Sequence, residues 1–87
     1  MATYTVTCRG KLARGVIAQL TNGGVYLYDE EERGSGGDGT RRHFLQIEAG
    51  SADDAILVAK GRMAVAGGSA HDYQATEGVA TEGAELD

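Results

Sequence analysis

The chain has 87 residues, which is enough for one small domain and leaves no room for two lobes around a cleft. It carries 8 Lys and Arg against 13 Asp and Glu, and the acidic excess lies entirely after residue 70. The net charge of −5 disfavours nucleic-acid backbones and anionic membranes as partners, so a basic protein surface is the more natural target.

The residues that usually carry chemistry are few and widely separated. Cys8, the one cysteine, cannot form an internal disulfide, and it lies far in sequence from His43 and His71. Neither a metal-ligand spacing nor a nucleophile with its base is recognisable. We therefore expect a non-enzymatic protein without metal or cofactor. With no long apolar run or signal core, we also expect a cytoplasmic location and no membrane contact.

The first predicted element is a strand over residues 3–8, where threonines alternate with larger or apolar residues. Tyr4, Val6 and Cys8 share one face, so Cys8 is expected to behave as a small buried apolar residue.

Residues 11–21 fit two structures. Leu12, Val16 and Leu20 recur at helical spacing, but Gly15 would cost a helix about 1 kcal/mol. Asn22-Gly23 is a strong hairpin signal, so we favour a hairpin joining strands at 16–20 and 25–28. In the alternative, Asn22-Gly23 ends a helix.

A long hairpin loop is predicted between strands at 25–28 and 43–48. Four of the six residues at 34–39 are glycine. Acidic residues 30–32 on one arm would face Arg41 and Arg42 on the other, which favours antiparallel pairing. The loop leads into a strand and not into a helix, so it does not predict a phosphate-binding loop.

The clearest predicted element is a C-terminal helix. Ser51 is a good N-cap, Asp53 and Asp54 lie in the first turn, and Gly67-Gly68 end the helix. Its expected apolar face consists of Ala52, Ala55, Ile56, Ala59, Met63 and Ala66.

Residues after 68 have little apolar surface and contain a near-repeat of Ala-Thr-Glu-Gly, so they read as disordered. The predicted fold class is α+β: a small antiparallel sheet of three to four strands packed on a C-terminal helix. The domain spans residues 1–68, and residues 69–87 form a flexible acidic tail.

The predicted function is that of a protein-binding module. One helix covers one sheet face, so the other would present an aromatic patch to a target or to a second copy. Acidic loop residues would add complementarity to a basic partner. The predicted partner-binding residues are Tyr26, Tyr28, Glu30, Glu31, Glu32 and Phe44. A one-residue change of strand register would instead bury Phe44.

In size, acidity and lack of catalytic groups, the chain is similar to small inhibitors encoded by bacterial viruses, including anti-CRISPR proteins that occupy a nucleic-acid channel. This likeness of general character implies an inhibitor that binds a protein.

Two alternatives remain. In the first, Arg9, Arg14, Arg41 and Arg42 bind the phosphates of a single-stranded nucleic acid while the tyrosines stack on its bases. In the second, the chain is a precursor peptide whose tail repeat is modified by another enzyme.

Overall fold

The computed structural model describes residues 1–31 and 40–79 of the chain. Its elements in chain order are β1 (Ala2–Gly10), α1 (Arg14–Asn22), β2 (Tyr26–Glu31), β3 (Arg41–Ala49), α2 (Ala52–Ala66) and β4 (His71–Glu77). The four strands form one antiparallel sheet in the order β2-β3-β1-β4. This order and these connections are those of the split β-α-β, or ferredoxin-like, arrangement.

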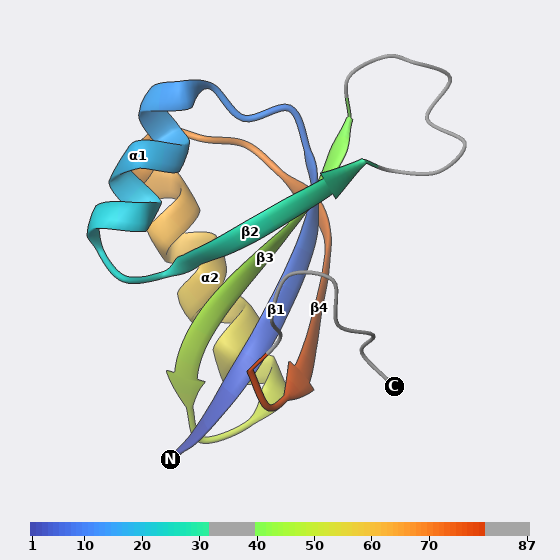
Figure 1. The fold of residues 1–87 in the computed structure, drawn as a ribbon. Helices are drawn as coiled ribbons and strands as arrows, with labels where there is room; N and C mark the ends of the chain where they lie inside the picture. The colour runs from blue at the N-terminus through green and yellow to red at the C-terminus, as the bar shows by residue number, and fades with distance from the viewer. Residues whose placement is uncertain (32–39, 80–87) are drawn as a thin grey trace.

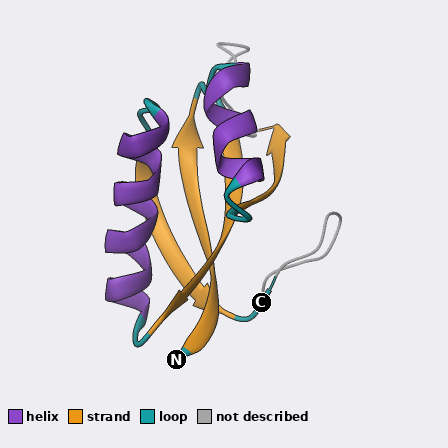
Figure 2. Cartoon of the chain, turned by 90° about the vertical axis from the view of Figure 1, so that its left-hand side faces the viewer, coloured by secondary structure: helices purple, strands orange, loops and turns teal. Residues whose placement is uncertain are grey.

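Both described helices lie on the same face of the sheet, and neither covers the opposite, helix-free face (Figures 1 and 2). The core between the helices and the sheet contains Val6 and Cys8 from β1, Leu45 and Ile47 from β3, Val16 and Leu20 from α1, and Ala55, Ala59 and Met63 from α2. The predicted α+β class and the predicted inward face of β1 are therefore confirmed.

Helix α2 begins and ends where the sequence predicts. The Ser51 side chain accepts a hydrogen bond from the Asp54 backbone N–H at 3.2 Å, and Gly67 adopts a left-handed conformation with φ 84°. Three of the predicted apolar positions are buried, at Ala55, Ala59 and Met63. No described helix is long and apolar enough to cross a membrane.

The predicted hairpin at 16–28 is wrong, because residues 14–22 form helix α1. Val16 and Leu20, one turn apart, are buried against the core, so the segment supplies a second helix to a sheet that α2 alone covers only in part. Gly24, at φ 74°, reverses the chain after the helix. Asn22-Gly23 thus ends a helix, as in the alternative interpretation.

The predicted disorder after residue 68 is wrong for residues 71–77, which form edge strand β4 beside β1. The end of β4 is fixed by two bonds. The Thr5 hydroxyl donates to the Gly78 carbonyl at 2.6 Å, and the Gly78 N–H donates to the Thr3 carbonyl at 2.8 Å. Backbone pairing stabilises a polar segment that apolar burial alone would not order. The rest of the predicted tail, residues 80–87, lies outside the described residues.

Each edge strand contains a bulge. In β2, Tyr26 pairs with Leu45 and Tyr28 pairs with Phe44, so Leu27 is an extra residue. In β4, the register shifts close to Asp72, whose φ is +54°. A bulge reverses which face the following residues occupy, and this matters most for the tyrosines of β2.

Gly61 in the middle of α2 gives a stability prediction. A Cβ at this position would have no atom within 4 Å, so Gly61→Ala gains helix propensity without a clash. We expect a gain of about 1 kcal/mol in the free energy of unfolding, measured by urea denaturation. Gly68→Ala is the contrasting variant, because its Cβ would lie 2.7 Å from both Met63 Sδ and Val16 Cγ1. A destabilised Gly61→Ala or a stabilised Gly68→Ala would contradict this packing.

Candidate functional site: a groove beside the free edge of β3

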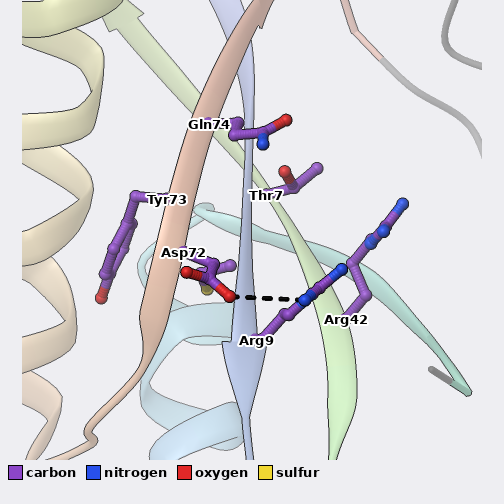
Figure 3. A pocket seen from close by; sticks show the side chains of 7 residues that line it. Thr7, Arg9, Arg42, Asp72, Tyr73 and Gln74 are labelled. Atoms are coloured by element: carbon purple, nitrogen blue, oxygen red, sulfur yellow. Dashed lines mark hydrogen bonds and ion pairs between the residues drawn. The ribbon is translucent and has the colours of Figure 1, made fainter. Parts of the chain in front are cut away.

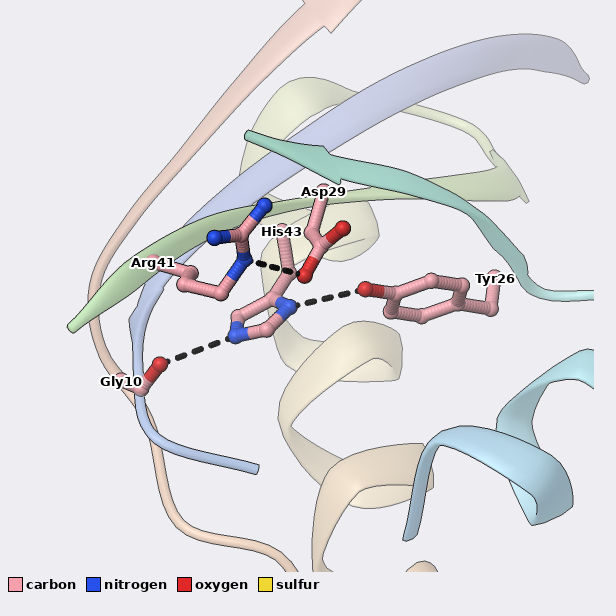
Figure 4. Close-up of polar contacts among 5 residues, drawn as sticks. All are labelled: Gly10, Tyr26, Asp29, Arg41 and His43. Carbon is pink, nitrogen blue, oxygen red and sulfur yellow. Dashed lines mark hydrogen bonds and ion pairs between the residues drawn. The ribbon is translucent and has the colours of Figure 1, made fainter. Parts of the chain in front are cut away.

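The predicted aromatic patch does not form as one exposed surface, because the bulge at Leu27 places the tyrosines on opposite faces. Tyr26 lies on the helix side, where it packs against the main core. Its hydroxyl lies 2.9 Å from Nδ1 of the buried His43 (Figure 4). Burial, followed by the charge of Asp29, raises the pKa of the Tyr26 hydroxyl well above its usual range. The predicted placement of Tyr26 on the helix-free face is therefore wrong.

Tyr28 and Phe44 do lie on the helix-free face, but both are buried. Their rings stack with centroids 4.4 Å apart and an interplanar angle of 11°. With 9% and 3% of their surface exposed, they form a small second core with Leu27. Their contribution to a binding surface is therefore small in this conformation.

The acidic residues of β2 are paired with the basic residues of β3, as predicted. Glu30 is opposite Arg42, Glu31 is opposite Arg41, and the Arg41 Nε donates to the Asp29 carboxylate at 2.6 Å. This hydrogen bond and the Asp29 charge raise the pKa of Arg41. Glu30 and Glu31 are exposed at the end of β2, and the predicted residue Glu32 lies outside the described residues.

Two of the four arginines proposed for nucleic-acid binding lie together on the helix-free face. Arg9 and Arg42 are opposite each other on β1 and β3 and line a hollow of about 240 Å³ with Thr7 and Gln74 (Figure 3). Arg9 also forms an ion pair with Asp72 at 3.4 Å. No exposed tyrosine pair adjoins them, so the arrangement lacks the stacking platform that the nucleic-acid hypothesis needs.

Cys8 is fully buried, and burial raises its pKa from 9.0 to about 11. At pH 8 the thiolate fraction is therefore about a hundredth of that of a free cysteine, and we expect at least about a hundredfold slower reaction with Ellman's reagent than in the denatured chain. The unfolded state loses this proton first, so the contribution of Cys8 to stability is complete below pH 9 and declines as the pH rises towards 11. Equal rates for native and denatured protein would contradict the burial.

A free strand edge is the most distinctive feature of the described surface. β3 pairs with β1 along its whole length, whereas its pairing with β2 ends at Tyr26 and Leu45. One further hydrogen bond, from the Gln46 N–H to the Val25 carbonyl at 2.7 Å, is the last backbone contact between β3 and the chain leading into β2 within the described residues. Alternate residues of an antiparallel strand direct their backbone groups to the same side, so the N–H and C=O of Glu48, like those of Gln46, point towards the β2 side. No described strand lies opposite Glu48 on that side.

This free edge borders a groove of about 430 Å³ between β3, α2 and the chain leading into β2. Apolar atoms come from Val25, Ile47 and Val58, and Val58 is 42% exposed. Arg62 of α2 also lines it, and it forms no hydrogen bond or ion pair within the described part of the chain. A smaller hollow of about 110 Å³ shares Gly23, Val25 and Arg62 and extends the groove towards Val65.

The groove combines a backbone donor and acceptor, an apolar floor and a cation. It was not predicted from the sequence, because it depends on where β2 stops beside β3. The one available signal was the composition of α2, where Leu57 and Val58 add large apolar side chains outside the expected buried face.

Among residues 1–31 and 40–79, no three His, Cys, Asp or Glu residues lie close enough together to hold a metal ion. Comparisons with family models, curated proteins and solved structures found no match to this chain.

Proposed function

We propose that the protein is a non-enzymatic protein-binding module that takes up an extended segment of a partner in the groove beside β3. The observation that carries the proposal is the free edge of β3 at Glu48, because it borders the groove that Val58 and Arg62 line. Extended peptides bind such edges by adding a strand, with backbone bonds for affinity and side-chain pockets for specificity.

The groove also indicates which side chains the segment carries. Alternate residues of an added strand face the same side of the sheet, here towards α2. One of these would contact Val25, Ile47 and Val58 and is therefore aliphatic. Another would reach Arg62, whose guanidinium pairs best with a carboxylate. The proposed ligand is an aliphatic residue and an acidic residue separated by one position.

The test uses seven-residue peptides displayed on phage as the probe, selected on the full chain. We expect enriched peptides that contain the aliphatic and acidic pair. Their dissociation constants, measured by fluorescence anisotropy, should be on the order of micromolar, because short peptides lose conformational entropy on binding. Replacing the acidic residue of the peptide by its amide should weaken binding to the wild type and have no effect on Arg62→Ala.

Glu48→Pro and Glu48→Ala form a matched pair. Proline removes the outward N–H and places its ring at the edge, whereas alanine keeps the N–H. Binding should fall at least about tenfold in Glu48→Pro and stay within about twofold in Glu48→Ala, as expected for the loss of one hydrogen bond. No enriched peptide, or equal binding by both variants, would refute the groove as the binding site.

The expectation of a basic partner rested on the net negative charge and on Glu30, Glu31 and Glu32, of which Glu30 and Glu31 lie within the described residues. They pair with Arg42 and Arg41 at the start of β3, whereas the groove lies at its other end. A partner long enough to cover both ends of β3 would contact the groove at one end and Glu30 and Glu31 at the other. The basic partner and the inhibitor role remain predictions.

A further inference from the structure

The outer face of α2 carries large apolar side chains that residues 1–31 and 40–79 leave exposed. Leu57 is 66% exposed and Val65 is 82% exposed, and Gly61 and Ala64 between them are exposed as well. A helix that buries one apolar face and exposes another is typical of one that has a second partner. Val58 and Arg62 of α2 line the main groove, and of the residues of this outer face only Val65 borders the smaller hollow that extends it.

The charges beside this face are arranged for self-recognition. Asp53 and Lys60 are seven residues apart, so they lie on the same flank of the helix. The Lys60 Nζ lies 5.5 Å from the centre of the Tyr73 ring, which places this flank on the β4 side. The flank is therefore negative near the start of α2 and positive one heptad later.

We propose that the outer face of α2 binds the same face of a second copy of this chain, with the two helices antiparallel. A two-fold axis perpendicular to the helices brings equal flanks together, so each Asp53 meets Lys60 of the other copy. The centre of this pairing falls between Ile56 and Leu57, so Leu57 packs close to its own symmetry copy, whereas Val65 lies beyond the start of the other copy's helix. The lack of a side chain at Gly61 lets the helices approach closely.

A single helix pair buries little area, so the dimer is weak and depends on concentration. In sedimentation or light-scattering measurements on the full chain, the mass should rise from 9.0 kDa towards twice that value between about 10 µM and about 1 mM. Leu57→Asp should remain monomeric over this range. A monomeric wild type, or dimerisation of Leu57→Asp like that of the wild type, would overturn the proposal.

Charge reversal tests the antiparallel geometry. Asp53→Lys and Lys60→Asp each turn two attractive contacts into repulsive ones, so each variant alone should dimerise at least about tenfold more weakly. An equimolar mixture of the two should regain the dimer, because Lys at 53 then meets Asp at 60 and Asp53 meets Lys60. The double variant should recover as well.

Both residues are exposed, and circular dichroism checks the fold of each variant. Failure of both the mixture and the double variant to recover would refute the pairing. Glu48→Pro, which blocks the groove, should dimerise like the wild type, so the dimer and the peptide-binding function can fail independently.

Discussion

Leu45→Ala should lower the free energy of unfolding by about 3–4 kcal/mol, the largest effect that we expect from a single substitution. Leu45 lies in β3, between β1 and β2, and none of its surface is exposed. Its removal loses the transfer free energy of the side chain and leaves a cavity between the sheet and both helices. Urea denaturation followed by circular dichroism, at concentrations where the wild type is monomeric, measures the change.

Leu57→Ala is the matched control, because it makes the same chemical change at a side chain that is 66% exposed. We expect a change within about 0.5 kcal/mol. If Leu45→Ala fails to fold, Leu45→Met preserves volume and should cost less than about 1.5 kcal/mol. Similar losses at Leu45 and Leu57 would contradict the placement of the core.

Tyr26→Phe should cost about 1–3 kcal/mol, because it leaves a buried nitrogen of His43 without its hydrogen-bond partner. His43 Nε2 lies 2.9 Å from the Gly10 carbonyl oxygen. Because a carbonyl oxygen can only accept a hydrogen bond, Nε2 carries the hydrogen and donates it to Gly10. In the neutral ring Nδ1 is then the acceptor, and the Tyr26 hydroxyl donates to it. Nitrogen-15 shifts of the imidazole should show the Nε2–H tautomer in the wild type.

Tyr4→Phe provides the comparison for this substitution. The Tyr4 hydroxyl makes no hydrogen bond within the described part of the chain, so a change within about 0.5 kcal/mol is expected. The pair of variants also tests the bulge in β2. If Tyr26 lay on the helix-free face beside Tyr28, its substitution by Phe would have as little effect as that of Tyr4.

The sequence by itself determined the elements whose signals are local. Alternation in β1 identified its inward face at Val6 and Cys8, because a pleated strand points successive side chains to opposite sides. Ser51 and Gly67 located both ends of α2, since caps satisfy the end groups of a helix whatever surrounds it. The acidic and basic arms of β2 and β3 likewise predicted their pairing.

Only the tertiary structure decided the elements whose local signals were balanced or weak. Val16 and Leu20 fit a helix and a strand equally well, and the uncovered part of the sheet selected the helix. Residues 71–77 have little apolar surface of their own, and they form β4 because β1 offers them a backbone ladder.

The candidate site depended still more on contacts that are distant in sequence. The bulge at Leu27 places Tyr26 and Tyr28 on opposite faces of the sheet, because one extra residue between them breaks the alternation, and local composition does not reveal its position. The groove exists because β3 is longer than β2 on the side where α2 presents Val58 and Arg62. That difference arises from how three separate segments pack, and therefore no single stretch of the sequence encodes it.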